Sequence, residues 1–525
     1  MNLALLPLPV SCTHHAAAGC RISADTLIIA DAGTRPEAEL LSLMLAQVLG
    51  RPLRVCDELT ATTLQTIRLV RSTSAGTHEE AYRLDSTSTG IVLQAANPIG
   101  LGWAVQALVQ LVPPHAPAGA EVPSLTIIDQ PRFGWRGVML DPARHFLPVE
   151  EVLRYIDLIA RHRFNRLHLH LTDDQGWRME IRRYPRLTSV GAWRSETLVG
   201  HLGKPPHAYD GTPHGGYYTQ DDCRRIVAYA AARHVTVVPE IDLPGHMQAA
   251  IAAYPWLGND GKECGVFTQW GVNPHILNAE ERTLGFLEDV LSEVMEVFPS
   301  PWIHVGGDEA IKDEWTASAR IQERIRELGC TDEHGLQSHI IKRMDRFLTA
   351  RGRRLLGWEE IAEGGLSPNA TVMSWRGITA GIEAAKLGHD VIMAPVSHTY
   401  FDYYQHPDFS TQPLSIAGTL TLEKTYSYDP VPPELNADQA QHILGGQGQL
   451  WGEYIVNREQ LDILAFPRLC ALAEVLWTAQ SQRDWAGFQQ RLDVHCTRLE
   501  ALGVGYFRVK TPGSDACAQM AKHHA

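Results

Sequence analysis

Acidic side chains stand where predicted strands end in the second part of this chain of 525 residues. The sharpest example is the segment HVGGDE, which closes with Asp308 and Glu309. Neighbouring side chains on a strand point to opposite sides unless the strand bends, and the two glycines permit a bend and let a ligand approach the backbone. Taken alone, these two acids are better explained as caps of the following helix, whose dipole favours acids. The full set of strand-end residues favours a functional site instead.

The other strand ends carry a similar mixture of acids, aromatic rings, arginine and histidine. Carboxylates combined with indole faces suit a sugar ring, because the polar ring edges accept and donate hydrogen bonds while the C–H faces lie on indole. A cation is the alternative ligand for acids and aromatic rings. The residues are Asp141, Arg144 and His145; His170, Asp173 and Asp174; Glu240, Asp242 and His246; Trp358, Glu359 and Glu360; Trp375 and Arg376; His398, Tyr400 and Asp402; Trp451 and Glu453.

Histidines raise the question of a metal site. His168 and His170 lie two apart on a predicted strand, face the same side, and resemble the H-x-H pair of metallohydrolases. A packed or hydrogen-bonded pair is favoured, because the fifth and sixth strands offer tryptophan where a binuclear site needs further histidine. His246 is either a turn residue or a group that tunes a nearby carboxylate, and its position favours tuning. Three tryptophans are assigned to packing: Trp135, Trp302 and Trp477.

The elements that position these residues alternate between strand-like runs and amphipathic helices. This alternation indicates βα units and a parallel sheet, and eight strands match a (β/α)8 TIM barrel, whose active site lies at the carboxyl ends of the strands. An open doubly wound sheet is the rival, weakened because no glycine-rich phosphate loop follows a strand. The predicted strands are 135–141, 166–172, 235–242, 301–309, 353–360, 371–377, 390–396 and 445–453, and the clearest helices are 149–164, 221–234, 282–298, 335–352 and 460–477.

Three parts follow from these patterns. Residues 1–132 form an N-terminal α+β domain, with β-type runs at 25–31, 66–72, 81–87 and 90–97 and helices at 35–50 and 97–114. The barrel takes 133–505 and a C-terminal tail 506–525.

Composition excludes several classes of protein. Lys+Arg total 46 and Asp+Glu 60, and the resulting net charge of −14 is unsuited to general nucleic-acid binding. The nine cysteines are scattered without a C-x-x-C pair, against a disulfide scaffold and a thiolate zinc site. No apolar run approaches the roughly 20 residues of a spanning helix, so we expect a soluble protein without membrane contact. The N-terminus lacks the basic start of a secretory signal, which favours the cytoplasm and leaves periplasmic or secreted locations open. The oligomeric state is not specified.

Eight motifs occur in an order that resembles a known family. They are RGVMLDPARHF, LHLHLTDDQGWR, VVPEIDLPGH, HVGGDEA, GWEE, MSWRG, TYFDYY and QGQLWGE. Each is weak alone, but together they are similar to glycoside hydrolase family 20, the β-N-acetylhexosaminidases, over about residues 20–505.

The resemblance implies catalytic roles. Glu309 would be the general acid that protonates the glycosidic oxygen. Asp308 would hold the 2-acetamido group of the substrate and stabilise its developing positive charge. Tyr400 would donate a hydrogen bond to the acetamido oxygen. Asp173, or its neighbour Asp174, would form a relay with His246 that tunes Glu309.

The resemblance also implies a sugar-binding set and needs no metal or organic cofactor. Three tryptophans would wall the acetamido pocket and the sugar face, while an arginine and two acids would bind the ring hydroxyls. These residues are Trp358, Trp375 and Trp451, with Arg144, Asp402 and Glu453.

The implied activity is retaining, exo-acting hydrolysis of terminal β-linked GlcNAc, with GalNAc as a second candidate, through an oxazolinium ion formed by the substrate's own acetamido group. The general acid must be protonated near neutral pH, so we expect burial and Asp308 to raise the pKa of Glu309. Ile416 departs from the family, in which many members carry tryptophan on the leaving-group side. The alternatives are a relative that releases a disaccharide such as lacto-N-biose, a non-catalytic sugar-binding barrel, and a metallohydrolase.

Overall fold

The computed structural model describes residues 4–57 and 65–508. Its larger part is a closed barrel of eight parallel strands, which confirms the predicted (β/α)8 fold. Seven strands fall inside a predicted range, and the eighth, which begins at Ile443, starts two residues before its predicted range of 445–453. The strands are mostly buried, because helices cover the outside of the barrel. In chain order they are β10 (Trp135–Leu140), β11 (Arg166–His170), β18 (Thr236–Glu240), β19 (Trp302–His304), β20 (Arg354–Trp358), β21 (Thr371–Ser374), β22 (Val391–Met393) and β23 (Ile443–Leu450).

Amphipathic helices surround the strands. They include α3 (Val149–Arg161), α5 (Gln220–Ala231), α7 (Glu281–Val297) and α10 (Glu333–Thr349). The connection between β20 and β21 is short and contains a 3₁₀ turn, η3 (Glu359–Ala362), in place of a long helix.

The predicted helix over 460–477 is wrong in one respect, because the structure divides it into α15 (Arg458–Ala465) and α16 (Arg468–Trp477). Pro467 lacks the N–H that a continuous helix needs, and a residue before proline avoids helical geometry. Phe466 accordingly has φ −105° and ψ 141°, in the extended region.

The N-terminal part is a seven-stranded mixed sheet with the strand order β1-β9-β6-β7-β5-β3-β4. The runs predicted as strands form β3 (Leu27–Ile29), β5 (Thr66–Arg71), β6 (Tyr82–Thr87) and β7 (Gly90–Ala95), and the predicted helices form α1 (Arg35–Leu49) and α2 (Pro98–Leu111). The remaining strands of this sheet are β1 (Ser11–His14), β4 (Val55–Cys56) and β9 (Leu125–Asp129).

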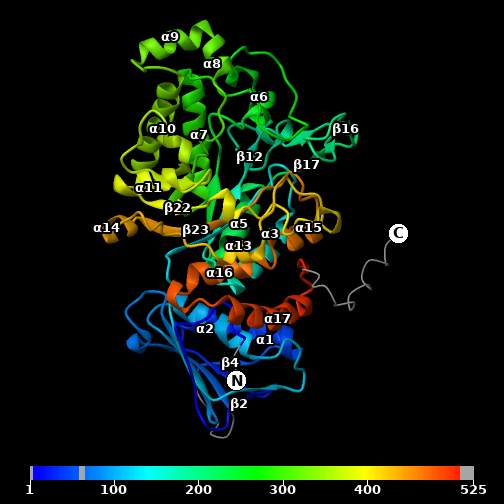
Figure 1. The fold of residues 1–525 in the computed structure, drawn as a ribbon, viewed down its shortest axis with the longest axis vertical. Helices are drawn as coiled ribbons and strands as arrows, with labels where there is room; N and C mark the ends of the chain where they lie inside the picture. The colour runs from blue at the N-terminus through cyan, green and yellow to red at the C-terminus, as the bar shows by residue number, and fades with distance from the viewer. Residues whose placement is uncertain (1–3, 58–64, 509–525) are drawn as a thin grey trace.

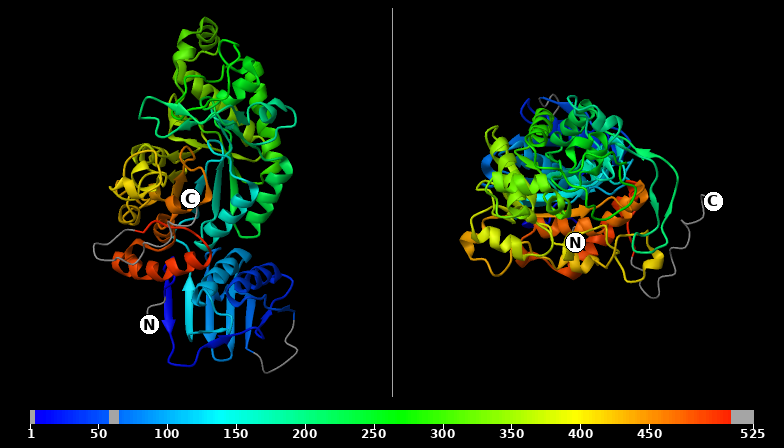
Figure 2. Two further views of the ribbon diagram at one scale, coloured as in Figure 1. Left: turned by 90° about the vertical axis from the view of Figure 1, so that its right-hand side faces the viewer. Right: turned by 90° about the horizontal axis from the view of Figure 1, so that it is seen from above.

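The two parts are stacked end to end along the long axis of the molecule (Figure 2). Helices α1 and α2 lie beside α17 (Trp485–Ala501) where the parts meet (Figure 1). The proposed tail falls mostly in 509–525, outside the described residues. None of the helices in the described ranges is both long enough and apolar enough to cross a bilayer.

Candidate active site

A cavity of about 220 Å³ opens at the carboxyl ends of the barrel strands. The family resemblance gives roles to eleven residues, counting Asp173 as the partner of His246. Ten of them line the cavity, while Asp173 is buried. The lining comprises Arg144, His246, Gly271, Val272, Asp308, Glu309, Trp358, Trp375, Val396, Tyr400, Asp402, Tyr403, Ile416, Trp451 and Glu453.

The loop that carries Asp308 and Glu309 bends sharply after β19. Gly306 and Gly307 have φ of 62° and 104°, and Glu309 itself has φ 48°, a region that non-glycine residues rarely adopt. The predicted bend is therefore confirmed. A Cβ on Gly306 would lie 1.7 Å from Oδ1 of Asp242, so the glycine also makes room for a neighbouring protein side chain.

The helix-cap alternative also fails. The next helix, α8 (Asp313–Ala317), begins after Lys312, several residues beyond the acidic pair. Asp308 and Glu309 both face the cavity.

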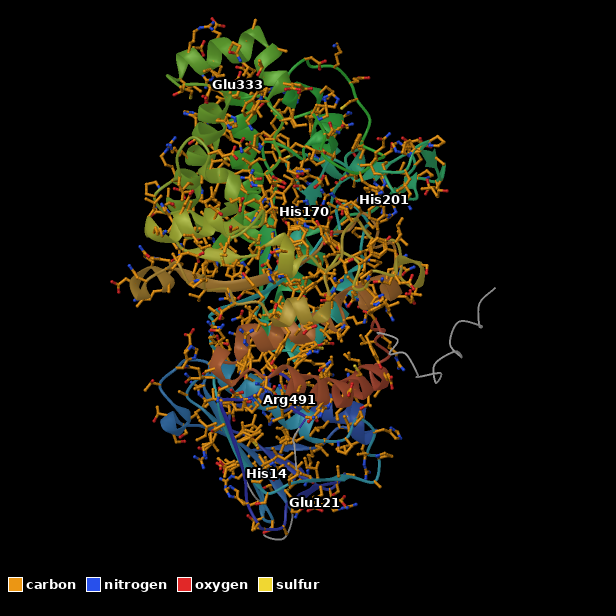
Figure 3. The ribbon with its side chains drawn as sticks, viewed as in Figure 1. His14, Glu121, His170, His201, Glu333 and Arg491 are labelled. Atoms are coloured by element: carbon orange, nitrogen blue, oxygen red, sulfur yellow. The ribbon has the colours of Figure 1, made fainter. Side chains whose placement is uncertain are left out.

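A buried chain of groups connects Glu309 to the barrel interior. Nε2 of His246 lies 3.5 Å from Oε2 of Glu309, and its Nδ1 lies 3.2 Å from Oδ1 of Asp173. Asp174 is slightly farther from the same ring, at 3.6 Å. The other oxygen of Asp173 lies 2.8 Å from Nε2 of His170, a residue labelled in Figure 3. The geometry favours Asp173 over Asp174 as the direct partner of His246.

The pKa of Glu309 differs from the expectation. Burial raises it, but the contact with His246 outweighs burial and leaves the pKa of Glu309 below its usual value. Burial alone would lower the pKa of His246, yet Asp173, Asp174 and Glu309 raise it well above its usual value. Burial is the largest single influence on the pKa of Glu309, but the hydrogen bond and charge of His246, together with the charge of Arg144, outweigh it.

Asp308 behaves differently from its neighbour. Burial raises its pKa, His246 opposes this, and the negative charges of Glu240 and Glu309 raise it further. One of its oxygens, Oδ1, is buried without a hydrogen-bond partner.

Three indole rings and a phenol form the aromatic wall of the cavity. Trp358 and Trp451 have ring centroids 5.7 Å apart, and Trp375 stacks beside Tyr400 at 6.2 Å. Two indole N–H groups are fixed from behind: Nε1 of Trp358 donates to Glu240 at 2.9 Å, and Nε1 of Trp375 donates to Glu360 at 3.0 Å. The rings of Trp358 and Trp375 are therefore held in place by carboxylates that do not line the cavity.

Glu240 is the common partner of the barrel histidines. Its oxygens lie 2.9 Å from Nε2 of His168 and 2.8 Å from Nδ1 of His304, and Nδ1 of His170 meets the same carboxylate. All four side chains are fully buried. Nδ1 of His168 also lies 2.9 Å from Nε2 of Gln447, so His168 and His170 each have a hydrogen-bond partner, in agreement with the hydrogen-bonded interpretation.

Arg144, Asp402 and Glu453 form the polar part of the lining, and the Arg144 guanidinium lies 5.0 Å from the centroid of the Trp451 ring. Arg144 pairs with Asp141 at 2.8 Å and with Asp173 at 2.7 Å, and it lies 4.0 Å from Glu453. Asp402 is 4% exposed, and neither of its carboxylate oxygens has a partner. Burial and Glu453 raise its pKa well above the usual value. Acceptors of this kind suit hydroxyl donors of a ligand.

Sequence reasoning missed four lining residues: Gly271, Val272, Val396 and Tyr403. Gly271 and Val272 lie in an irregular segment before α7, where no periodicity marks a position as facing the site. Tyr403 stands in the quoted motif TYFDYY, so its neighbours gave a usable signal. Ile416 does line the cavity, and its carbonyl oxygen meets Nε2 of His201, which is labelled in Figure 3.

Carboxylates, indole faces and a buried arginine that meet at the carboxyl end of a closed barrel are typical of a glycosidase site. Comparison with known families gives the more specific class. The family model described as glycosyl hydrolase family 20, catalytic domain, matches residues 133–480, and the model described as domain 2 of that family matches residues 2–130. The chain belongs to glycoside hydrolase family 20.

Individual relatives agree. A β-hexosaminidase of Porphyromonas gingivalis is 45% identical over 82% of this chain. The matched region covers only 54% of the length of that relative. The β-N-acetylhexosaminidase of Streptomyces coelicolor A3(2) has a similar structure, with a TM-score of 0.84, 32% identity and coverage of 98% of this chain and 99% of that one. The exo-β-N-acetylglucosaminidase of Vibrio harveyi, solved with N-acetylglucosamine, gives a TM-score of 0.84 and 32% identity over 97% of this chain and 79% of that one.

Proposed function

We propose that this protein is an exo-acting, retaining β-N-acetylhexosaminidase. It releases terminal β-linked GlcNAc from the non-reducing ends of small carbohydrates or glycoconjugates, and GalNAc as a second substrate. The similar enzyme of Vibrio harveyi was solved with N-acetylglucosamine, which supports a sugar of this kind.

The observation that carries the proposal is a set of buried acceptors without partners beside a tryptophan wall. Both oxygens of Asp402 and one oxygen of Asp308 are buried and unpartnered. Buried polar groups are normally hydrogen-bonded, so these atoms call for donors from a ligand. Sugar hydroxyls suit Asp402, an amide N–H suits Asp308, and the acetamido methyl suits the indoles of Trp358 and Trp375.

The reaction then uses the substrate as its own nucleophile. The acetamido carbonyl oxygen attacks the anomeric carbon while the bond from that carbon to the leaving oxygen breaks. Glu309 donates its proton to the leaving oxygen. Asp308 accepts the amide N–H and stabilises the positive charge of the oxazolinium ion, a charge absent from the ground state.

In the second step Glu309, now a carboxylate, removes a proton from water. The water oxygen attacks the anomeric carbon, the ring of the oxazolinium opens, and the sugar leaves with its original configuration. Because His246 is cationic, it favours the carboxylate form that this step requires. Asp173 holds His246 in position through the contact at Nδ1.

The test compares rates on nitrophenyl β-GlcNAc, nitrophenyl β-GalNAc and nitrophenyl lacto-N-bioside. We expect rapid release from GlcNAc, slower release from GalNAc and none from the disaccharide. Cleavage of lacto-N-bioside alone identifies the disaccharide-releasing alternative. Binding of GlcNAc without cleavage of any substrate identifies a non-catalytic barrel.

A further inference from the structure

Glu360 is a buried carboxyl that the mechanism above does not use. It follows β20 within η3, is 6% exposed, and does not line the cavity. Its Oε2 accepts the indole N–H of Trp375 at 3.0 Å. It thus lies directly behind one wall of the site.

We propose that Glu360 is a positioning residue of the active site, which fixes the Trp375 ring by its hydrogen bond and adds its charge to that of Asp308. The inference rests on the proposed function, because it concerns the ion that forms beside Asp308 and Trp375.

Glu360 and its neighbour Glu359 divide the contacts of the β21 loop between them. Glu359 accepts the backbone N–H of Trp375 at 3.0 Å and binds Nε of Arg376 at 2.7 Å. The indole N–H of Trp375 goes to Glu360, whose other oxygen lies 3.6 Å from Nε of Arg376. Glu359 therefore holds the loop, and Glu360 holds the ring.

Charged groups face Glu360 from each neighbouring segment. They are Asp308 after β19, Arg376 after β21, Lys312 before α8, and Glu359 in its own turn. Burial and the charge of Asp308 raise the pKa of Glu360 to about 7, although Trp375 and Arg376 act in the opposite direction. Asp308 and Glu360 carry like charges, so the charge of Asp308 favours the neutral form of Glu360.

The hydrogen bond from the Trp375 indole N–H to Glu360 persists when Glu360 changes its protonation state. Since Trp375 donates to Oε2, the proton of the neutral form resides on Oε1. Only the charge changes: Glu360 is neutral below its pKa and negative above it. The added negative charge stabilises the cationic oxazolinium, which favours catalysis on the alkaline side.

The variant Glu360→Gln separates charge from position. Its amide oxygen still accepts from Trp375, but the side chain never ionises. We expect the ratio of wild-type to variant kcat/KM on nitrophenyl GlcNAc to lie near 1 at about pH 6 and to rise roughly threefold or more by about pH 8. The matched control is Glu363→Gln, a partly exposed acid that also contacts Arg376, for which the ratio stays constant with pH.

Glu360→Ala removes the acceptor for the indole as well. We expect its KM to rise about fivefold at every pH, because the Trp375 ring loses its hydrogen bond. Normal KM in this variant, or a pH-independent ratio for Glu360→Gln, overturns the proposal.

Infrared difference spectra recorded without substrate test the titration of Glu360 independently of the proposed hydrolase activity. Between pH 6 and 8 the wild type loses the carbonyl stretch of a protonated carboxyl, and Glu360→Gln lacks this change, whereas a wild type without the change contradicts the inference. If the wild type releases no sugar, the proposed function fails, and the infrared band alone decides whether Glu360 titrates beside Asp308.

Discussion

Two buried aspartates at opposite ends of the barrel show how the same residue type serves two purposes. Asp129, at the junction with the N-terminal sheet, accepts hydrogen bonds from Tyr82 at 2.8 Å, Arg163 at 2.7 Å and Trp477 at 3.0 Å. Asp402, at the cavity, has no partner for either oxygen. The junction satisfies its charge within the protein, whereas the cavity leaves acceptors for a ligand.

The contrast extends beyond these two residues. Among residues 4–57 and 65–508, five side chains have a buried carboxylate oxygen without a hydrogen-bond partner, and four of the five lie at the cavity end: Asp174, Asp242, Asp308 and Asp402. The fifth is Glu37. At the junction, by contrast, Arg136 binds Glu80 at 2.6 Å, and Arg491, labelled in Figure 3, binds Glu474 at 2.6 Å. The buried carboxylates of the junction are therefore paired within the protein, whereas several at the cavity end keep an oxygen without a partner.

The largest expected effect is on activity at the cavity end. Glu309→Gln should lower kcat on chitobiose by about 10²- to 10⁴-fold, because an alkoxide leaving group needs the proton. Nitrophenyl GlcNAc should lose far less, since nitrophenolate needs little protonation. Thermal unfolding of the variant, measured alongside, should be unchanged. Equal losses on both substrates argue against a general acid at this position.

A change at the junction with the N-terminal sheet should affect stability more than activity. Asp129→Ala leaves the buried guanidinium of Arg163 without its carboxylate partner. The free energy of unfolding should therefore fall by about 3–5 kcal/mol in urea titrations. Asp402→Ala is the matched control and should leave stability unchanged while raising KM. A similar loss of stability in both variants would remove the distinction between the two ends.

The pH profile sharpens the account of Glu309. His246 lowers the pKa of Glu309, so the protonated acid is lost as pH rises through that lowered value. His246→Asn removes the cation and should move the alkaline limb of kcat/KM to higher pH, by about one unit. A limb that moves to lower pH, or does not move, shows that another group limits activity.

The smallest effect concerns the leaving-group side. Ile416→Trp should lower KM for chitobiose by a few-fold, because an aromatic pair contributes about 0.5–1.5 kcal/mol, and only a second sugar reaches the new ring. Nitrophenyl GlcNAc serves as the control, and its KM should hardly change. If both substrates respond alike, Ile416 does not contact the second sugar.

Much of the cavity end could be predicted because barrel topology brings strand ends together. Once eight strands were identified, residues as distant as Arg144 and Glu453 had to meet at one end. The short strands β1 and β4 gave too few residues for a period to be recognised, and the break at Pro467 lay inside a strong helical pattern.

Other features depend on contacts that a sequence does not contain. The lowered pKa of Glu309 depends on the 3.5 Å approach of His246, and the space beside Gly306 is filled by Asp242 from the loop after β18. Val272 enters the cavity from an irregular loop. In each case the sequence shows the residue type but not which residue lies next to it in the folded protein.

The central claim is that the substrate's acetamido group is the nucleophile, and a series of N-fluoroacetyl substrates tests it most directly. Each fluorine withdraws electrons from the attacking carbonyl oxygen, so kcat should fall progressively from acetyl to trifluoroacetyl, and no covalent sugar should be found on the enzyme. Equal rates across the series, together with a 2-fluoro sugar trapped on Asp308, Asp402 or Glu453, would contradict the substrate-assisted mechanism.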